Sequence, residues 1–247
     1  MSTTSPAGDE VQLVADHVGA TVAQLERRIR ARFGDRGLTR AARDLADLVE
    51  VVQQSAGASR VRLHRTTVLA RVVSVTVVVA TVVALVITLK EAVTEGLDNG
   101  FDWLPLIEST ISDIVFAAIA VLFLWAFPER YERKTLLALL HRLRSLAHVI
   151  DMHQLTKDPE RLLDRGKETA SSPKRTLSGP ELLRYLDYCS EMLSLIGKLA
   201  ALYVQKFNDP VALAAVNEVE ELTTGLSRKI WQKIMILDSF LAEKLVR

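Results

Sequence analysis

The most apolar part of the chain is the uncharged stretch Val72–Leu89, VVSVTVVVATVVALVITL, in which valine and threonine predominate. Valine favours β-strands, but strands average about five or six residues, and no turn signal interrupts this stretch. A soluble core helix of this length keeps a polar face, whereas this one offers only hydroxyls that can bond to their own backbone. About twenty apolar residues cross a bilayer as a helix. The pattern therefore predicts a transmembrane helix over residues 69–89.

A second uncharged stretch, Ile114–Phe127, reads IVFAAIAVLFLWAF. By itself it is short for a membrane span and would also suit a buried core helix. Extending it back through LIESTISD gives the required length, although the extension includes Glu108 and Asp113. The sequence thus predicts a second transmembrane helix over residues 107–127.

Charged residues around the two spans predict how the chain is threaded. Lys and Arg near span ends favour the cytoplasmic side. The basic flanks, expected to anchor at the inner leaflet, are Arg60, Arg62, Arg65, Arg71, Arg130, Arg133 and Lys134. The intervening loop 90–106 carries one lysine against Glu91, Glu95, Asp98 and Asp102. We therefore expect a membrane hairpin at residues 66–128 in the plasma or inner membrane, with both termini cytoplasmic and the short acidic loop external.

The start of the chain predicts a cytoplasmic helical hairpin. The first thirty residues lack the apolar core of a cleavable signal peptide, so the first span is expected to direct insertion. After a disordered segment 1–8, apolar residues recur at spacings of three and four in two stripes, which indicates amphipathic helices. GDRG at 34–37 separates these stripes, and glycine suits a left-handed helix end. We expect this hairpin at residues 9–59, with SAGAS at 55–59 as a joint.

The C-terminal half also has helical periodicity. A helix at 129–163 is expected to extend from the second span, with Pro128 at a bend. The Gly-, Ser- and Lys-rich segment 164–179 is typical of a flexible linker. Two long stripes separated by Asn208–Pro210 predict an antiparallel helix pair at 180–247, with helix starts at Gly179-Pro180 and Asp209-Pro210. The predicted fold class is all-α: a two-transmembrane-helix hairpin with a cytoplasmic bundle of N- and C-terminal helices.

Composition narrows the function classes. The formal net charge of +1 argues against a general nucleic-acid binder. The single cysteine, Cys189, cannot form a disulfide framework or a thiol metal site, and we expect it to be a small buried core residue. The sequence contains no phosphate-cradling glycine loop, GxSxG or HExxH motif. We therefore expect no cofactor and no enzymatic activity.

Asp113 is the strongest candidate for a functional residue within the membrane. Ionisable groups inside spans are energetically costly, and they usually face the protein interior or a water-filled cavity. In a symmetric oligomer Asp113 would form an acidic ring, with Glu108 one tier further out, and such rings select cations. The acidic loop would then concentrate cations at the mouth. In the alternative interpretation Asp113 pairs with Lys90 or reaches the headgroups, while Arg71 acts as an anchor.

One helix face carries a weaker candidate site. His141, His148 and Asp151 follow at spacings of seven and three, and His153 is close by. A histidine and a carboxylate three residues apart can share a metal or perform acid–base chemistry, and histidine can sense pH near neutrality. The alternative is a hydrogen-bonding face between helices.

At the level of architecture, two spans with a helical cytoplasmic part resemble the small two-span effectors of antiphage systems and ion channels with a two-helix pore unit. The TVGYG filter of potassium channels is absent. We expect a non-enzymatic membrane protein in the lipid bilayer that forms a homo-oligomer or binds a cytoplasmic protein through its helical body. The alternative is an oligomeric cation channel or membrane-permeabilising effector.

Overall fold

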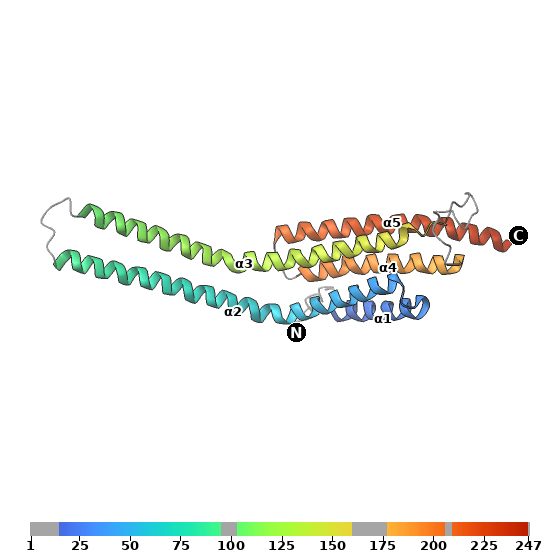
Figure 1. The fold of residues 1–247 in the computed structure, drawn as a ribbon, viewed down its shortest axis with the longest axis horizontal. Coiled ribbons are helices and arrows are strands. Elements are labelled where there is room, and N and C mark those ends of the chain that lie inside the picture. The colour runs from blue at the N-terminus through green and yellow to red at the C-terminus, as the bar shows by residue number, and fades with distance from the viewer. Residues whose placement is uncertain (1–14, 95–102, 160–176, 206–208, 247) are drawn as a thin grey trace, which may run out of the picture. The chain divides into compact units, whose positions relative to one another are not determined.

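The computed structural model describes residues 15–94, 103–159, 177–205 and 209–246. Within these ranges the chain is helical and contains no strand, which confirms the all-α prediction. The long helices are α1 (Ala15–Phe33), α2 (Gly37–Thr94), α3 (Trp103–Leu155), α4 (Gly179–Val204) and α5 (Pro210–Val246) (Figure 1). The chain divides into two compact units. The first unit combines residues 1–56 with 136–247, and the second consists of residues 57–135.

The turn between α1 and α2 follows the expected chemistry. Gly34 has φ +63°, the left-handed conformation that glycine adopts without steric cost. Its N–H donates to the carbonyl of Arg30 at 2.9 Å. The buried Thr39 hydroxyl donates to the Gly34 carbonyl at 2.6 Å, which ties the first turn of α2 to the end of α1.

The expected joint at SAGAS does not interrupt the chain, because α2 is helical through residues 55–59. Alanine is the best helix former, and a single interior glycine costs only about 1 kcal/mol. Likewise Pro128 lies inside α3, so the second apolar stretch and residues 129–155 belong to one helix.

The starts of α4 and α5 confirm the sequence prediction. Ser178 caps α4 in a capping box, in which its N–H donates to the Glu181 carboxylate at 2.8 Å. At α5 the Asp209 carboxylate accepts the N–H groups of Val211 and Ala212, at 2.8 and 3.1 Å. Pro210 follows at the first helical position, where its missing N–H has no cost.

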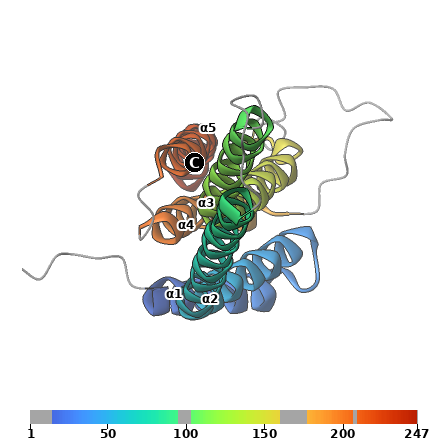
Figure 2. The ribbon, with the colours of Figure 1, turned by 90° about the vertical axis from the view of Figure 1, so that its left-hand side faces the viewer.

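The first unit has one hydrophobic core. Fully buried side chains come from each helix that enters it, as Ile29, Leu45, Leu143, Leu193 and Ile230 illustrate. Helices α4 and α5 pack along each other (Figure 2). The start of α4 lies against the end of α5, because a Cβ built on Gly179 would come within 2.9 Å of the Leu241 side chain. The two helices therefore run antiparallel, and Cys189 of α4 is buried in the core.

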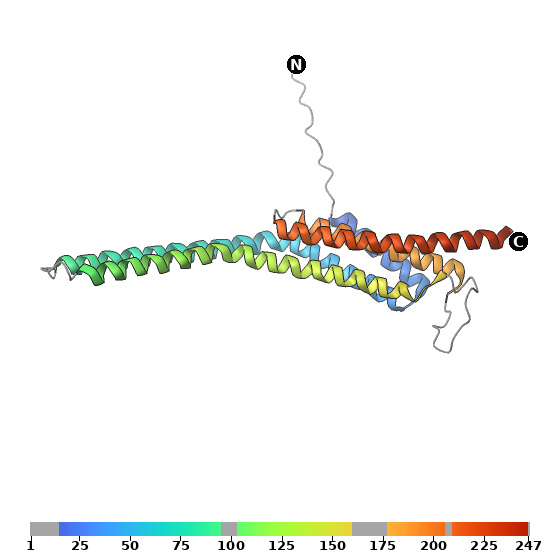
Figure 3. The same cartoon turned by 90° about the horizontal axis from the view of Figure 1, so that it is seen from above.

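The second unit contains the two long apolar stretches, and its parts of α2 and α3 lie side by side (Figure 3). Two helical segments, Thr67–Glu91 and Leu106–Leu155, are long and apolar enough to cross a membrane. Only 6% of the most apolar window of the first segment is buried, and none of that of the second. Both stretches therefore direct most of their apolar side chains outward, and neither is the core of a folded domain.

Candidate functional site

Asp113 and Glu108 both lie in the first half of α3 and are exposed. Neither has an ion pair or side-chain hydrogen bond within the described part of the chain. The exposed Lys90 does not pair with Asp113 there. Glu91 is exposed in the last turn of α2. The other acidic residues of the predicted mouth, Glu95, Asp98 and Asp102, lie outside the described residues.

Hydroxyl groups in the first apolar stretch satisfy the helix itself. Ser74, Thr81 and Thr88 donate to the carbonyls four residues earlier, at 2.8, 2.9 and 3.1 Å. The backbone and its hydroxyls therefore need no outside partner, which is the requirement for a helix in hydrocarbon. This is the pairing that the sequence suggested for these residues.

The basic residues expected to act as anchors lie in the first and last parts of the second unit, residues 57–135. Arg60, Arg62 and Arg65 belong to α2, but their side chains lie outside the described part of the structure. The remaining anchors are Arg71, Arg130, Arg133 and Lys134, of which Arg133 is half-buried and the others are exposed. The Arg130 guanidinium lies 6.0 Å from the centre of the Phe123 ring, so its stem runs back along the apolar surface.

The residues of the predicted histidine site lie in different environments and do not form one site. His141 and His148 are exposed on α3. Asp151 accepts a hydrogen bond from Gln154 at 2.6 Å. His153 packs against α2, because a Cβ built on Gly37 would lie 2.3 Å from its ring. Across the described ranges, no group of three or more His, Cys, Asp or Glu side chains could hold a metal ion.

Burial lowers the pKa of His153, and the nearby cations Arg40 and Lys157 lower it further. The surroundings of the half-buried imidazole therefore favour its neutral form. This environment comes from α2 and from the end of α3, which sequence spacing along α3 does not reveal.

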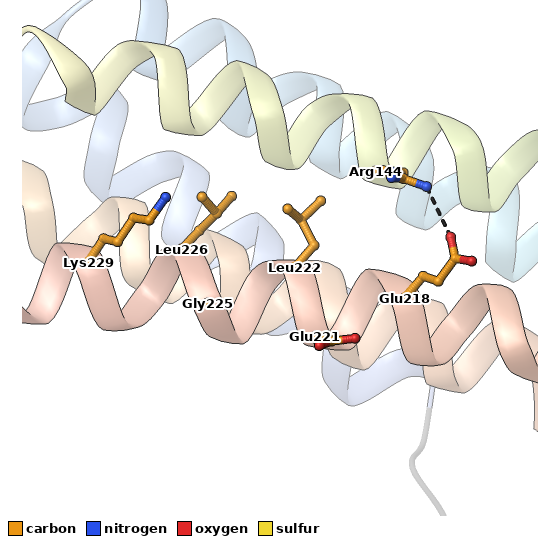
Figure 4. Close-up of a pocket in the computed structure, with 7 residues that line it drawn as sticks. All are labelled: Arg144, Glu218, Glu221, Leu222, Gly225, Leu226 and Lys229. Atoms are coloured by element: carbon orange, nitrogen blue, oxygen red, sulfur yellow. Dashed lines mark hydrogen bonds and ion pairs between the residues drawn. The ribbon is translucent and has the colours of Figure 1, made fainter.

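A groove of about 580 Å³ runs between α3 and α5 in the first unit (Figure 4). Arg144 of α3 closes one end by donating to Glu218 of α5 at 3.0 Å. Leu222 and Leu226 point from α5 toward α3 and form an apolar floor. The cationic side chain of Lys229 lines the groove beyond Leu226. A Cβ built on Gly225 would meet nothing within 4 Å, so the middle of the groove is open. Leu222 and Leu226 belong to the second apolar stripe of the segment 180–247, and the stripe by itself did not predict this groove.

A polar network joins α3 and α5 further along. Lys233 donates to the side-chain oxygen of the buried Gln154 at 2.7 Å and to its carbonyl at 3.1 Å. Burial lowers the pKa of Lys233, while the carboxylates of Asp158 and Asp151 act in the opposite direction. Neither Gln154 nor Lys233 could be identified from the sequence, because only the tertiary structure brings the two side chains together.

No family model, no characterised protein and no solved structure matches this chain. Its function is therefore inferred from its own sequence and structure.

Proposed function

We propose that this chain is a non-enzymatic integral membrane protein, anchored by a two-helix hairpin. The observation that carries the proposal is that two long apolar helical segments bury almost none of their most apolar windows. The exposed side chains along them include Val75, Val79, Phe116, Leu122 and Phe123. Soluble monomers rarely expose contiguous apolar patches beyond a few hundred Å². A bilayer is the solvent that covers such a surface on the outward faces of both helices.

The charge pattern supports an orientation with both termini in the cytoplasm and loop 90–106 outside. Labelling of introduced cysteines tests it, in a Cys189→Ala background. We expect a membrane-impermeant maleimide to label Asp98→Cys from outside intact cells, and Ser2→Cys only after permeabilisation. The reverse labelling pattern would contradict the orientation. Release of the protein by alkaline carbonate would contradict membrane insertion itself.

We further propose that the helical body self-associates or binds a cytoplasmic partner, as a scaffold or sensor. Two observations support an interaction surface on the first unit. The groove between α3 and α5 combines an apolar floor with Arg144, Lys229, Glu218 and Glu221. Large apolar side chains are also exposed on its helices, namely Met152, Trp231 and Met235. The mass of the detergent-solubilised protein, corrected for bound detergent by light scattering, tests self-association.

The alternative function is an oligomeric cation channel or membrane-permeabilising effector. It is supported by the exposure of Asp113 and Glu108 without a partner in the described residues, because a carboxylate inside a membrane needs a partner or water. Two spans are too few to enclose a path in one chain, so this function requires a ring of four or more copies. Ion flux into reconstituted vesicles, compared between the wild type and Asp113→Asn, tests it. Asp47→Asn on the exposed surface of the body is the matched control.

A further inference from the structure

A second groove, of about 350 Å³, lies within the second unit. Val75, Val78 and Val79 of α2 line it together with Val121 and Trp125 of α3, and Arg71 stands at one end. Ser74 also contributes, but its hydroxyl donates to the Ala70 carbonyl at 2.8 Å. The wall of the groove therefore presents hydrocarbon along its length and a cation at its end.

The length of the groove matches one leaflet of a bilayer. Its lining on α2 runs from residue 71 to residue 79, which is about 12 Å of helix at 1.5 Å per residue. The hydrocarbon core of a bilayer is about 30 Å thick, so an acyl chain of one leaflet extends about 15 Å. Arg71 lies about one turn inside the apolar segment Thr67–Glu91, near the end at which the basic flank is expected to meet the headgroups.

Arg71 lacks a carboxylate partner among the described residues. Its side chain is exposed, and no ion pair or hydrogen bond engages its guanidinium there. The two glutamates that follow the second span, Glu129 and Glu132, make no ion pair with Arg71 in the described part of the chain. An unpaired guanidinium beside an apolar groove favours an anionic group that carries a hydrocarbon chain. Arginine matches phosphate geometry because its N–H groups form a planar fork.

We propose that this groove binds one anionic phospholipid, with an acyl chain along Val75, Val78, Val79 and Val121 and its phosphate on Arg71. Trp125 borders the chain, where an indole can keep its ring in hydrocarbon and its N–H toward the interface. The inference rests on the proposed membrane insertion. A peptide is a poorer occupant, because the Ser74 hydroxyl already donates to the Ala70 carbonyl and only Arg71, at one end, is left to bond a buried backbone.

Fluorescence quenching of Trp125 tests the proposal in the full-length protein. Trp103→Phe and Trp231→Phe leave Trp125 as the sole indole. The protein is reconstituted into phosphatidylcholine vesicles, and phosphatidylglycerol or phosphatidylcholine brominated on its acyl chains is titrated in. We expect half-maximal quenching at a mole fraction about fivefold lower for the anionic lipid, since one basic residue near the surface contributes on the order of 1 kcal/mol. Arg71→Gln should abolish the difference.

The control is Lys90→Gln, which removes a cation at the other end of the same apolar segment and should keep the fivefold preference. Equal quenching by both lipids, or a preference that survives Arg71→Gln, would overturn the inference. Absence of quenching from a protein that floats with the vesicles would mean that protein covers the groove, and would overturn the lipid site while leaving membrane insertion intact. Failure to float would instead contradict the proposed function.

Discussion

Lys233 of α5 donates two hydrogen bonds to Gln154 of α3, one to the side-chain oxygen at 2.7 Å and one to the carbonyl at 3.1 Å. Gln154 is one residue from the end of α3, where the helix dipole favours a cation, and its carbonyl also accepts the N–H of Lys157 at 3.0 Å. Its side-chain amide in turn donates to Asp151. One lysine of α5 therefore bonds both oxygens of a buried residue near the end of α3 and links the two helices.

Replacing Lys233 by methionine should destabilise the first unit by roughly 1–2 kcal/mol, because the buried Gln154 oxygen loses its donor while the apolar stem is kept. A change of this size lowers the melting temperature by about 2–4 °C per kcal/mol for a unit of this length. Scanning calorimetry in detergent measures it. Lys229→Met, one turn earlier in the open groove, is the control, and an equal loss there would contradict a specific role for Lys233.

Replacement of two glycines by alanine should change the stability of the first unit in opposite directions. Gly34→Ala forces an L side chain to φ +63° and should cost on the order of 1 kcal/mol. Gly225→Ala lies in the interior of α5, where a Cβ meets open space, and should stabilise by roughly 0.5–1 kcal/mol. Thermal melts of both variants check the pair. Destabilisation by Gly225→Ala would show that the groove is occupied in the assembled protein.

His153 should make the first unit less stable in acid. Its pKa in the folded state is lowered, chiefly by burial and further by Arg40 and Lys157. The unfolded state therefore binds more protons than the folded state between the folded pKa and the unfolded value near 6.5. Above the unfolded pKa the imidazole is neutral in both states, and it does not reduce the free energy of unfolding. As the pH falls through that value toward the folded pKa, the unfolded state binds the proton first, and the free energy of unfolding decreases.

Melting temperatures from pH 7.5 to 5 measure this dependence. Other groups titrate in the same range, so the informative quantity is the difference between the wild type and His153→Gln. We expect the acid-induced loss to be smaller in His153→Gln and unchanged in His141→Gln, where the side chain is exposed. If the wild type and His153→Gln lose stability in parallel, the imidazole is not the responsible group.

Cys189 should report global unfolding. The thiol is fully buried, and burial raises its pKa to about 12, so neither access nor thiolate formation favours reaction. A maleimide should label the native protein slowly at pH 7 and the denatured protein rapidly. The single cysteine makes the product unambiguous by mass spectrometry. Fast labelling under native conditions would show that α4 separates from its neighbours without unfolding.

Local rules accounted for the helix boundaries that the sequence predicted correctly. The left-handed glycine at Gly34, the capping box at Ser178 and Asp209-Pro210 each act within a few residues. The joint at SAGAS was the error in this series. Its serines and glycine are compatible with either a loop or a helix, and the helical segments on both sides decided the outcome.

The sequence alone determined the all-helical class, the two apolar segments and the buried cysteine, because periodicity, length and caps are properties of neighbouring residues. Tertiary structure decided which polar groups meet. Arg144 reaches Glu218, Lys233 reaches Gln154 and His153 packs on Gly37, across separations that no spacing rule covers. It also created both grooves, since a concave surface is formed by two helices together and neither helix contains it by itself.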